Sequence, residues 1–270
     1  MNLNTIVEVK RPKSFEEIEW RDGHAFLGGG TWLFSEPQVN TDTLVDLQQF
    51  GWAPLMVTPA GLEIAATCRI VELHDFKGPP EWQAVPLFDK CIDAFLMSFK
   101  IWNAATVGGN VVMSLPAGAM ISLTAALEGV CTLWPQNGQP RQVPVVDFVT
   151  GMHANVLQKG ELLRSILLPA TALKKCFAMR QVSLTRFGHS AALIIATVND
   201  DGSDFLLTVS AATPRPVHLR FEKTPSASEM HGAIDERLPS ASWFHDVHGT
   251  APYKRHITFY LAEQIRAELS

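Results

Sequence analysis

Leu27-Gly28-Gly29-Gly30-Thr31-Trp32-Leu33 is one of two glycine clusters in this sequence, and the other is Thr106-Val107-Gly108-Gly109-Asn110. Each follows an apolar stretch, so we expect the backbone to turn tightly there and to present N–H groups to an anion. Glycine runs mark ordinary turns more often than phosphate sites, so either cluster alone is weak evidence. Together they predict a pyrophosphate that is held from two sides.

Neither cluster matches the common nucleotide-binding fingerprints. The chain has no G-x-G-x-x-G that opens a helix, with an acidic residue about 20 positions later, and no G-x-x-x-x-G-K-[ST]. The Rossmann and P-loop explanations of the two clusters are therefore excluded.

Motifs along almost the whole chain resemble the FAD-binding medium subunit of the molybdenum hydroxylases, which include xanthine dehydrogenase, carbon monoxide dehydrogenase and aldehyde oxidoreductases. The first cluster is similar to that family's A-G-G-T-D-L, and residues 100–110 resemble Q-I-R-N-V-A-T-I-G-G-N. Residues 143–148, 160–163 and 211–217 are similar to V-P-A-E-D-F, G-E-L-L and V-A-P-T-P-V, and residues 249–256 resemble G-S-A-E-Y-R-R-H. Matches in the same order are more specific than any one of them.

The resemblance implies an α+β fold in two parts. The first is a two-part FAD-binding module of the vanillyl-alcohol-oxidase (PCMH) type, expected over residues 1–170 with subdomains at about 1–50 and 51–170. The second is a smaller C-terminal α+β domain of the CO-dehydrogenase flavoprotein type, expected over residues 171–270. The flavin would lie between them, because ligand sites favour domain interfaces.

Hydrophobic periodicity predicts elements that suit this arrangement. The expected strands are residues 24–27, 62–66, 177–182, 191–198 and 206–211, with a hairpin turn at 199–202. The expected helices are residues 14–19, 86–99, 116–127, 226–233 and 253–269, with another beginning at 73–76. Ser14 and Glu17 suggest a capping box for the first helix. We expect the helix that starts at Pro116 to point its positive dipole end at the anion site.

The resemblance also implies an electron-transfer role. The subunit would take electrons from iron–sulfur clusters on a small subunit, while a large subunit holds molybdopterin, and pass them through FAD to NAD, oxygen or another acceptor. FAD would be the only cofactor on this chain, and we expect an oligomeric complex. The chemistry belongs to the flavin, which the protein positions.

The cofactor-binding residues are carried over one by one. One side of the pyrophosphate would be held by Leu27, Gly28, Gly29, Gly30, Thr31, Trp32, Leu33 and Phe34, and the other by Thr106, Val107, Gly108, Gly109 and Asn110. Leu96 and Leu163 match positions beside the flavin ring, although core packing explains them equally well. Arg180 matches a basic position that reaches the polar edge of the ring and favours an anionic reduced flavin.

Three departures from the family pattern lie at this site. Trp32 replaces the acidic residue of A-G-G-T-D-L, Trp102 replaces the arginine of Q-I-R-N, and Ala119 replaces an aspartate expected to bind the ribose side of FAD. Losing a charge-assisted hydrogen bond costs roughly 1.5 to 3 kcal/mol, about ten- to a hundredfold in affinity. One alternative is therefore a degenerate member that has lost stable FAD binding and serves as a structural subunit. Another, a free-standing flavoprotein oxidase of related fold, is disfavoured because the chain has no recognisable substrate domain.

Composition excludes several other functions. The 270 residues carry a formal net charge of -5, with none of the basic character of a nucleic-acid-binding protein. The longest apolar run, residues 191–198, is far shorter than the roughly 20 residues of a membrane span. Residues 1–5 have no apolar core behind a basic start, so we expect no signal peptide and a cytoplasmic protein.

We assign no catalytic residue and no metal ligand. The four cysteines lack zinc or ferredoxin spacing, so we expect reduced thiols, mostly buried. His189 has no carboxylate partner beside it, and the pair His245 and His248 lacks further placed ligands.

Overall fold

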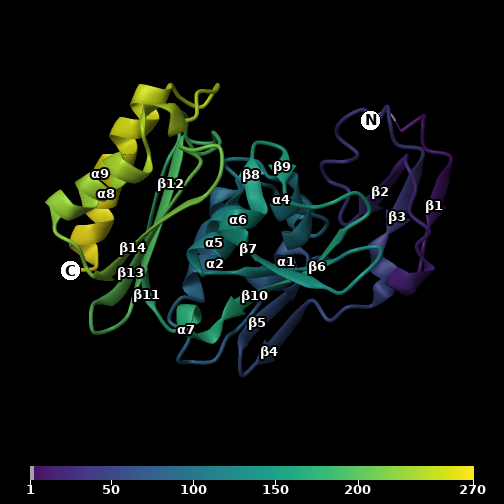
Figure 1. Ribbon diagram of the computed structural model, residues 1–270, viewed down its shortest axis with the longest axis horizontal. Helices are drawn as coiled ribbons and strands as arrows, with labels where there is room; N and C mark the ends of the chain where they lie inside the picture. Colours follow the sequence, from purple (N-terminus) through teal and green to yellow (C-terminus); the bar gives the residue numbers. More distant parts are fainter. Residues whose placement is uncertain (1–2) are drawn as a thin grey trace.

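The computed structural model describes residues 3–270, in which three sheets stand in a row with the two ends of the chain far apart (Figure 1). The first sheet is parallel with the order β1-β3-β2, and its strands are Glu8–Lys10 (β1), His24–Leu27 (β2) and Thr43–Asp46 (β3). A short 3₁₀ turn, η1 (Phe15–Glu17), lies between β1 and β2, and another, η2 (Leu47–Phe50), follows β3. The prediction for residues 24–27 is confirmed.

The helix expected at residues 14–19 is wrong. Only the single turn η1 forms, and the side chain of Ser14 makes no capping hydrogen bond. The carboxylate of Glu17 instead accepts from the backbone N–H of Lys13, at 2.9 Å. With one turn and no cap, the segment has too few hydrogen bonds to extend as an α-helix.

The central sheet is antiparallel with the order β4-β5-β10-β6-β7. Its strands are Leu55–Thr58 (β4), Gly61–Ala65 (β5), Val130–Trp134 (β6), Arg141–Pro144 (β7) and Leu162–Pro169 (β10). Strand β10 lies between β5 and β6, so the sheet closes only when segments far apart in the sequence pair. A small hairpin, β8 (Val149–Gly151) and β9 (Ala154–Asn155), precedes β10.

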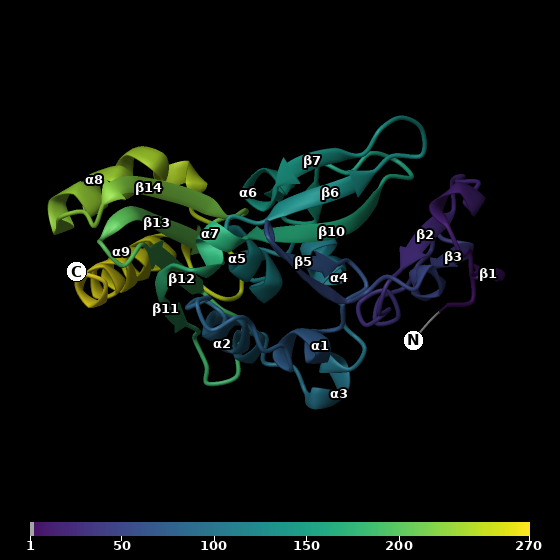
Figure 2. The same cartoon turned by 90° about the horizontal axis from the view of Figure 1, so that it is seen from below.

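Short helices cover this sheet, and Figure 2 shows α1, α2 and α3 on the side away from β6 and β7. The helices are Ile70–His74 (α1), Pro86–Ala94 (α2), Phe99–Trp102 (α3), Val107–Met113 (α4), Ala119–Ala126 (α5), Val145–Phe148 (α6) and Ala170–Leu173 (α7). The single helix expected at residues 86–99 is divided because Leu96 adopts φ 53°, a left-handed conformation that ends α2. The helix expected to begin near residue 73 begins at Ile70, and the one expected from residue 116 begins at Ala119.

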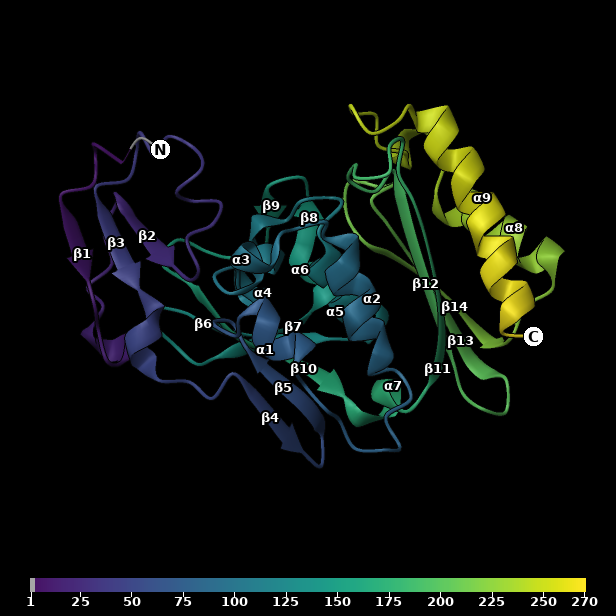
Figure 3. The ribbon, with the colours of Figure 1, turned by 180° about the vertical axis from the view of Figure 1, so that it is seen from behind.

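The third sheet is antiparallel with the order β11-β12-β13-β14, and Figure 3 shows two long helices over its outer face. Its elements are Cys176–Val182 (β11), Ala192–Val198 (β12), Ser203–Ser210 (β13), Val217–Lys223 (β14), Ala227–Arg237 (α8), Ser240–Ser242 (η3) and Ala251–Glu268 (α9). The hairpin turn at 199–202 is confirmed, with the N–H of Gly202 donating to the carbonyl of Asn199 at 2.8 Å. Strand β14 was not predicted, although its sequence V-H-L-R-F-E-K alternates apolar and polar residues as a strand with one buried face does.

Strand β12 is buried on both faces, which explains its uninterrupted apolar sequence. Leu193 and Ile195 belong to the core beneath the central helices, while Ile194 and Ala196 belong to the core beneath α8 and α9. Successive side chains of a strand point to opposite faces, so one strand supplies both cores. The third sheet is thereby packed against the central unit.

A cluster of ion pairs around the buried Lys175 also joins these two units. The ammonium of Lys175 is 3.0 Å from a carboxylate oxygen of Glu128, which follows α5, and 2.7 Å from one of Asp204 in β13. Arg220 of β14 pairs with the same two carboxylates. The positive charge of Lys175 is therefore compensated by carboxylates from both sides of the junction.

Candidate cofactor-binding site

The structure brings the two glycine clusters into contact. We call residues 28–34 the first loop and residues 106–110 the second loop. A Cβ on Gly28 would lie 3.0 Å from the hydroxyl of Thr106, and a Cβ on Gly29 would overlap the carbonyl oxygen of Ala104. Glycine is required at residue 29 because the two backbones approach so closely. The two loops are therefore neighbours, and their common role in holding one pyrophosphate stays a prediction.

The first loop follows β2 and contains a row of backbone N–H groups that donate to no acceptor among the described residues. Gly30 has φ 71°, and the N–H of Phe34 then donates to the carbonyl of Gly30 at 2.8 Å, which closes a helical turn. Within residues 3–270, the N–H groups from Gly29 to Leu33 donate to no acceptor. Backbone donors in a half-buried loop need a partner, and consecutive N–H groups at a tight turn form a concave site for an anion. This arrangement fits the pyrophosphate of FAD.

The second loop is the first turn of α4, and its N–H groups are already used. Val107 donates to the carbonyl of Cys68 at 2.8 Å, Gly108 to that of Ala66 at 3.1 Å, and Gly109 to the hydroxyl of Thr106 at 3.0 Å. The prediction of free N–H groups in this loop is therefore wrong. Sequence reasoning missed these acceptors because backbone carbonyls carry no residue-specific signal.

Gly108 serves packing in this loop. A Cβ there would lie 2.5 Å from the Cβ of Ala66 and 2.6 Å from its backbone oxygen. Gly109 is exposed, and its Cβ position faces only the Thr106 hydroxyl, at 2.8 Å. The second loop thus fixes the base on which the first loop rests.

Asn110 and Ala119 lie together at the start of α5. The side-chain oxygen of Asn110 accepts from the N–H of Met120 at 3.1 Å, so this residue caps the helix. Ala119 is fully buried and brings no polar group. The dipole end expected to face the anion therefore already has a protein partner.

The two tryptophans that depart from the family pattern lie in different surroundings. Trp32 is 40% exposed, and its ring centroid lies 6.0 Å from that of His153. Trp102 is half-buried, 5.2 Å from the ring of His74, and within residues 3–270 its indole N–H has no partner. His153 had no signal in the sequence, because it is a single histidine in the turn between β8 and β9.

The three residues expected beside the flavin ring do not form one group with the loops. Leu96 is 40% exposed at the bend between α2 and α3, and Leu163 is 1% exposed in the core of the central unit. Arg180 donates to the carbonyl of Met179 at 3.0 Å and pairs with Glu268 at the end of α9. Their contact with a flavin stays a prediction.

One titratable group of the motif regions, the carboxylate of Glu161, is held by partners. Glu161, 4% exposed, receives hydrogen bonds from Arg141 at 2.7 and 2.6 Å. Burial raises the pKa of this carboxyl, but the bonds from Arg141 and from the N–H of Gln158 outweigh it, and the pKa lies below its usual range. The four cysteines are free, and burial raises the pKa of Cys131 to about 12. These groups stabilise the fold.

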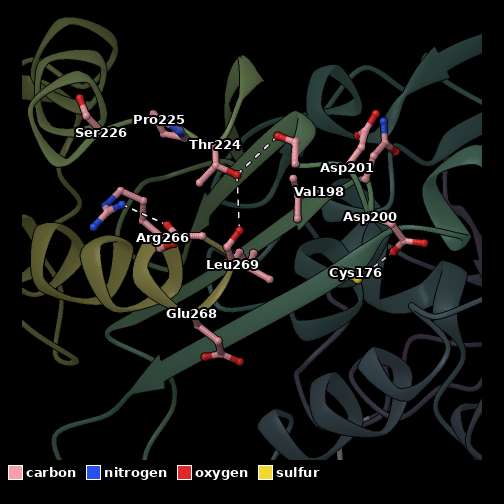
Figure 4. A pocket seen from close by; sticks show the side chains of 13 residues that line it. Cys176, Val198, Asp200, Asp201, Thr224, Pro225, Ser226, Arg266, Glu268 and Leu269 are labelled. Carbon is pink, nitrogen blue, oxygen red and sulfur yellow. Dashed lines mark hydrogen bonds between the residues drawn. The ribbon is translucent and has the colours of Figure 1, made fainter.

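Two cavities lie outside the loops. One of about 740 Å³ opens between the β12–β13 turn and the end of α9, where Cys176, Thr224 and Arg266 line it (Figure 4). None of the expected cofactor-binding residues lines it. A smaller one, of about 180 Å³, is lined by Gln48, whose amide lies 3.5 Å from the carbonyl of Gly28.

Comparisons with known proteins agree with this geometry. Residues 5–171 match the model of the FAD binding domain in molybdopterin dehydrogenase. No curated protein matches the chain.

No helix within residues 3–270 combines the length and the apolar character needed to cross a bilayer.

Solved structures similar to the chain confirm the expected α+β fold. A chain of quinoline 2-oxidoreductase from Pseudomonas putida 86 is 17% identical, with a TM-score of 0.79 over 97% of this chain and 96% of that one. A chain of carbon monoxide dehydrogenase from Hydrogenophaga pseudoflava, which lacks the Mo-pyranopterin moiety, is 20% identical, with a TM-score of 0.80 over 96% of each chain. A chain of reconstituted CO dehydrogenase from Oligotropha carboxidovorans is 19% identical, with a TM-score of 0.77 over 96% of this chain and 97% of that one.

Proposed function

The chain belongs to the family of FAD-binding domains in molybdopterin dehydrogenases, and from this premise we propose that it is the electron-transfer subunit of a multi-subunit oxidoreductase. The observation that carries the proposal is the row of unused N–H groups from Gly29 to Leu33, set against the second loop. FAD, when bound, supplies the redox chemistry.

Each part of the site has its own role in this proposal. The N–H groups of the first loop hold the pyrophosphate, and the hydroxyl of Thr31 adds a further donor. The second loop positions the first, and exposed Gly109 leaves room for the ligand to approach. In this proposal the FAD-binding module of the PCMH type occupies residues 1–170, and the smaller C-terminal domain occupies residues 171–270.

The partners follow from the same premise. We propose a small subunit with two-iron two-sulfur clusters as the electron donor and a large subunit that binds molybdopterin. NAD, oxygen or another acceptor would receive the electrons from FAD. The similarity in fold to chains of quinoline 2-oxidoreductase and CO dehydrogenase supports this assembly. Free cysteines suit a reducing compartment, and we propose the cytoplasm.

A visible absorption spectrum tests the proposal. The purified chain is measured before and after addition of excess FAD and removal of the unbound fraction. We expect retained flavin bands that bleach with a chemical reductant. If the chain retains no flavin under either condition, alone or co-purified with its partner subunits, it is not a flavoprotein subunit.

A further inference from the structure

The rings of Trp32 and His153 lie beside the row of free N–H groups and are not buried by the rest of the chain. Their centroids are 6.0 Å apart and their planes meet at 45°. Trp32 is 40% exposed and His153 is exposed as well. Two aromatic faces in contact with solvent, next to a site for an anion, offer a surface on which a planar ring can stack.

The backbone holds His153 in place. This residue adopts φ 52°, a conformation that costs energy for a residue with a side chain. Its N–H donates to the carbonyl of Ser114 at 3.0 Å, and the amide of nearby Asn155 donates to the carbonyl of Val112 at 2.8 Å. The β8–β9 turn is thereby fixed to the C-terminal end of α4, and its ring is presented toward Trp32.

The position of Trp32 selects one part of the ligand. Its own N–H belongs to the row that would hold the pyrophosphate, so its ring lies close to that group. In FAD the adenine is separated from the pyrophosphate by one ribose, whereas the isoalloxazine is separated by an open ribityl chain. The adenine is therefore the ring system within reach of Trp32.

The residues at the start of α5 offer the ligand no charged side chain, which leaves stacking as the available interaction. Ser114, to which the turn is fixed, lies between Asn110 and Ala119 in the chain. Asn110 is occupied as the cap of α5, and Ala119 has no polar side chain. Neither Asn110 nor Ala119 supplies a carboxylate for the sugar hydroxyls, so affinity for the adenosine half of FAD must come from another source.

We propose that the adenine of FAD stacks on the exposed Trp32 ring while the His153 ring packs against that indole and holds it in place, and we call this pair of residues the aromatic clamp. The clamp rests on the proposed function, since it requires FAD as the ligand. Stacking of a base on an aromatic side chain contributes about ten- to a hundredfold in affinity, which matches the loss expected from a missing charge-assisted hydrogen bond.

The test is equilibrium binding of FAD, and of ADP as a competitor without a flavin, followed by flavin fluorescence. The proteins are the unaltered chain, Trp32→Ala, Trp32→Phe, His153→Ala and the control Tyr260→Ala, an aromatic residue 56% exposed on α9. We expect Trp32→Ala to weaken FAD and ADP about ten- to a hundredfold. Trp32→Phe should stay within about threefold of the unaltered chain, His153→Ala should be intermediate, and the control should be unchanged.

The outcomes separate this inference from the proposed function. If the unaltered chain binds FAD and Trp32→Ala binds FAD and ADP equally well, the clamp is wrong and the FAD site stands. If Trp32→Ala weakens FAD but not ADP, the ring contacts the flavin half and the adenine assignment fails. If the unaltered chain binds neither ligand, alone or co-purified with its partner subunits, the proposed function itself is overturned, and the clamp with it. Circular dichroism of each variant verifies that the fold is retained.

Discussion

In the first glycine loop the N–H groups from Gly29 to Leu33 meet no acceptor within residues 3–270, whereas in the second loop every N–H from Val107 to Asn110 is bonded inside the protein. Both loops are rich in glycine, but for different reasons. In the first, Gly30 lets the backbone turn, Gly29 lets it approach Ala104, and donors are left free, whereas in the second Gly108 only lets α4 approach β5. One glycine pattern can therefore serve ligand access or close packing, and mutations can separate the two.

Gly29→Ala should have the largest effect, because the loops touch at this residue. The new methyl group would overlap the carbonyl oxygen of Ala104, and backbone cannot move aside as a flexible side chain does. We expect a loss of about 3 kcal/mol in the free energy of unfolding, measured by urea denaturation. Gly232→Ala in α8 is the matched control, since its Cβ position is open, and it should not destabilise the protein. An unchanged Gly29→Ala would mean that the loops are not in contact.

Gly108→Ala tests the packing role of the second loop. Its methyl group would press on Ala66, and we expect a loss of about 2 kcal/mol in the free energy of unfolding. The folded fraction should bind FAD within about twofold of the unaltered chain, because no free N–H is lost. A stable Gly108→Ala protein that no longer binds FAD would show that this glycine contacts the ligand.

Gly109→Asp should separate binding from stability. The residue is exposed and its Cβ position meets only the Thr106 hydroxyl, at 2.8 Å, so this side chain must shift and we expect a loss of at most about 1 kcal/mol in the free energy of unfolding, equal in the Asp and Asn variants. A carboxylate there would repel the pyrophosphate, and we expect FAD affinity to fall at least about tenfold, or 1.4 kcal/mol. Gly109→Asn provides the uncharged control. Equal FAD affinity of the Asp variant and the unaltered chain would contradict the two-loop site.

Thr106→Val should have the smallest effect. It removes the hydroxyl that accepts from the N–H of Gly109 at the start of α4, and loss of such a cap costs about 1 kcal/mol in the free energy of unfolding. Thr106→Ser keeps the acceptor and should restore most of the stability. Thermal denaturation of the two variants measures this difference, and equal melting temperatures would show that the cap contributes nothing.

Much of the fold could be predicted because its signals are local. The strand at residues 24–27 and the hairpin at 199–202 follow from periodicity and turn residues. The bend at Leu96 could not be predicted, since a left-handed leucine has no sequence signal and the apolar spacing continues past it. Strand β14 was predictable by the same rule, since Val217 to Lys223 alternate apolar and polar residues, but it was not predicted.

The same distinction applies to the candidate site, where local motifs could be predicted and contacts between distant segments could not. The glycine clusters predicted both loops, and the presence of two of them predicted a pyrophosphate held from both sides. The sequence could not indicate that the carbonyls of Ala66 and Cys68 occupy the second loop, because any residue type has a carbonyl. It also could not place His153 beside Trp32, since that pairing depends on how the β8–β9 turn is fixed to α4.

The late pairing of β10 has a consequence for synthesis of the chain on the ribosome. The N–H of Ala66, which supports the second loop, donates to the carbonyl of Arg164, and β5 pairs early with β4 but finds its second neighbour only in β10. A nascent chain that has released both glycine clusters still lacks the strand that seats them, and non-local pairing of this kind is slow. Flavin capture is then a late event in biogenesis, and a ribosome stalled before residue 162 would display both loops without a nucleotide pocket.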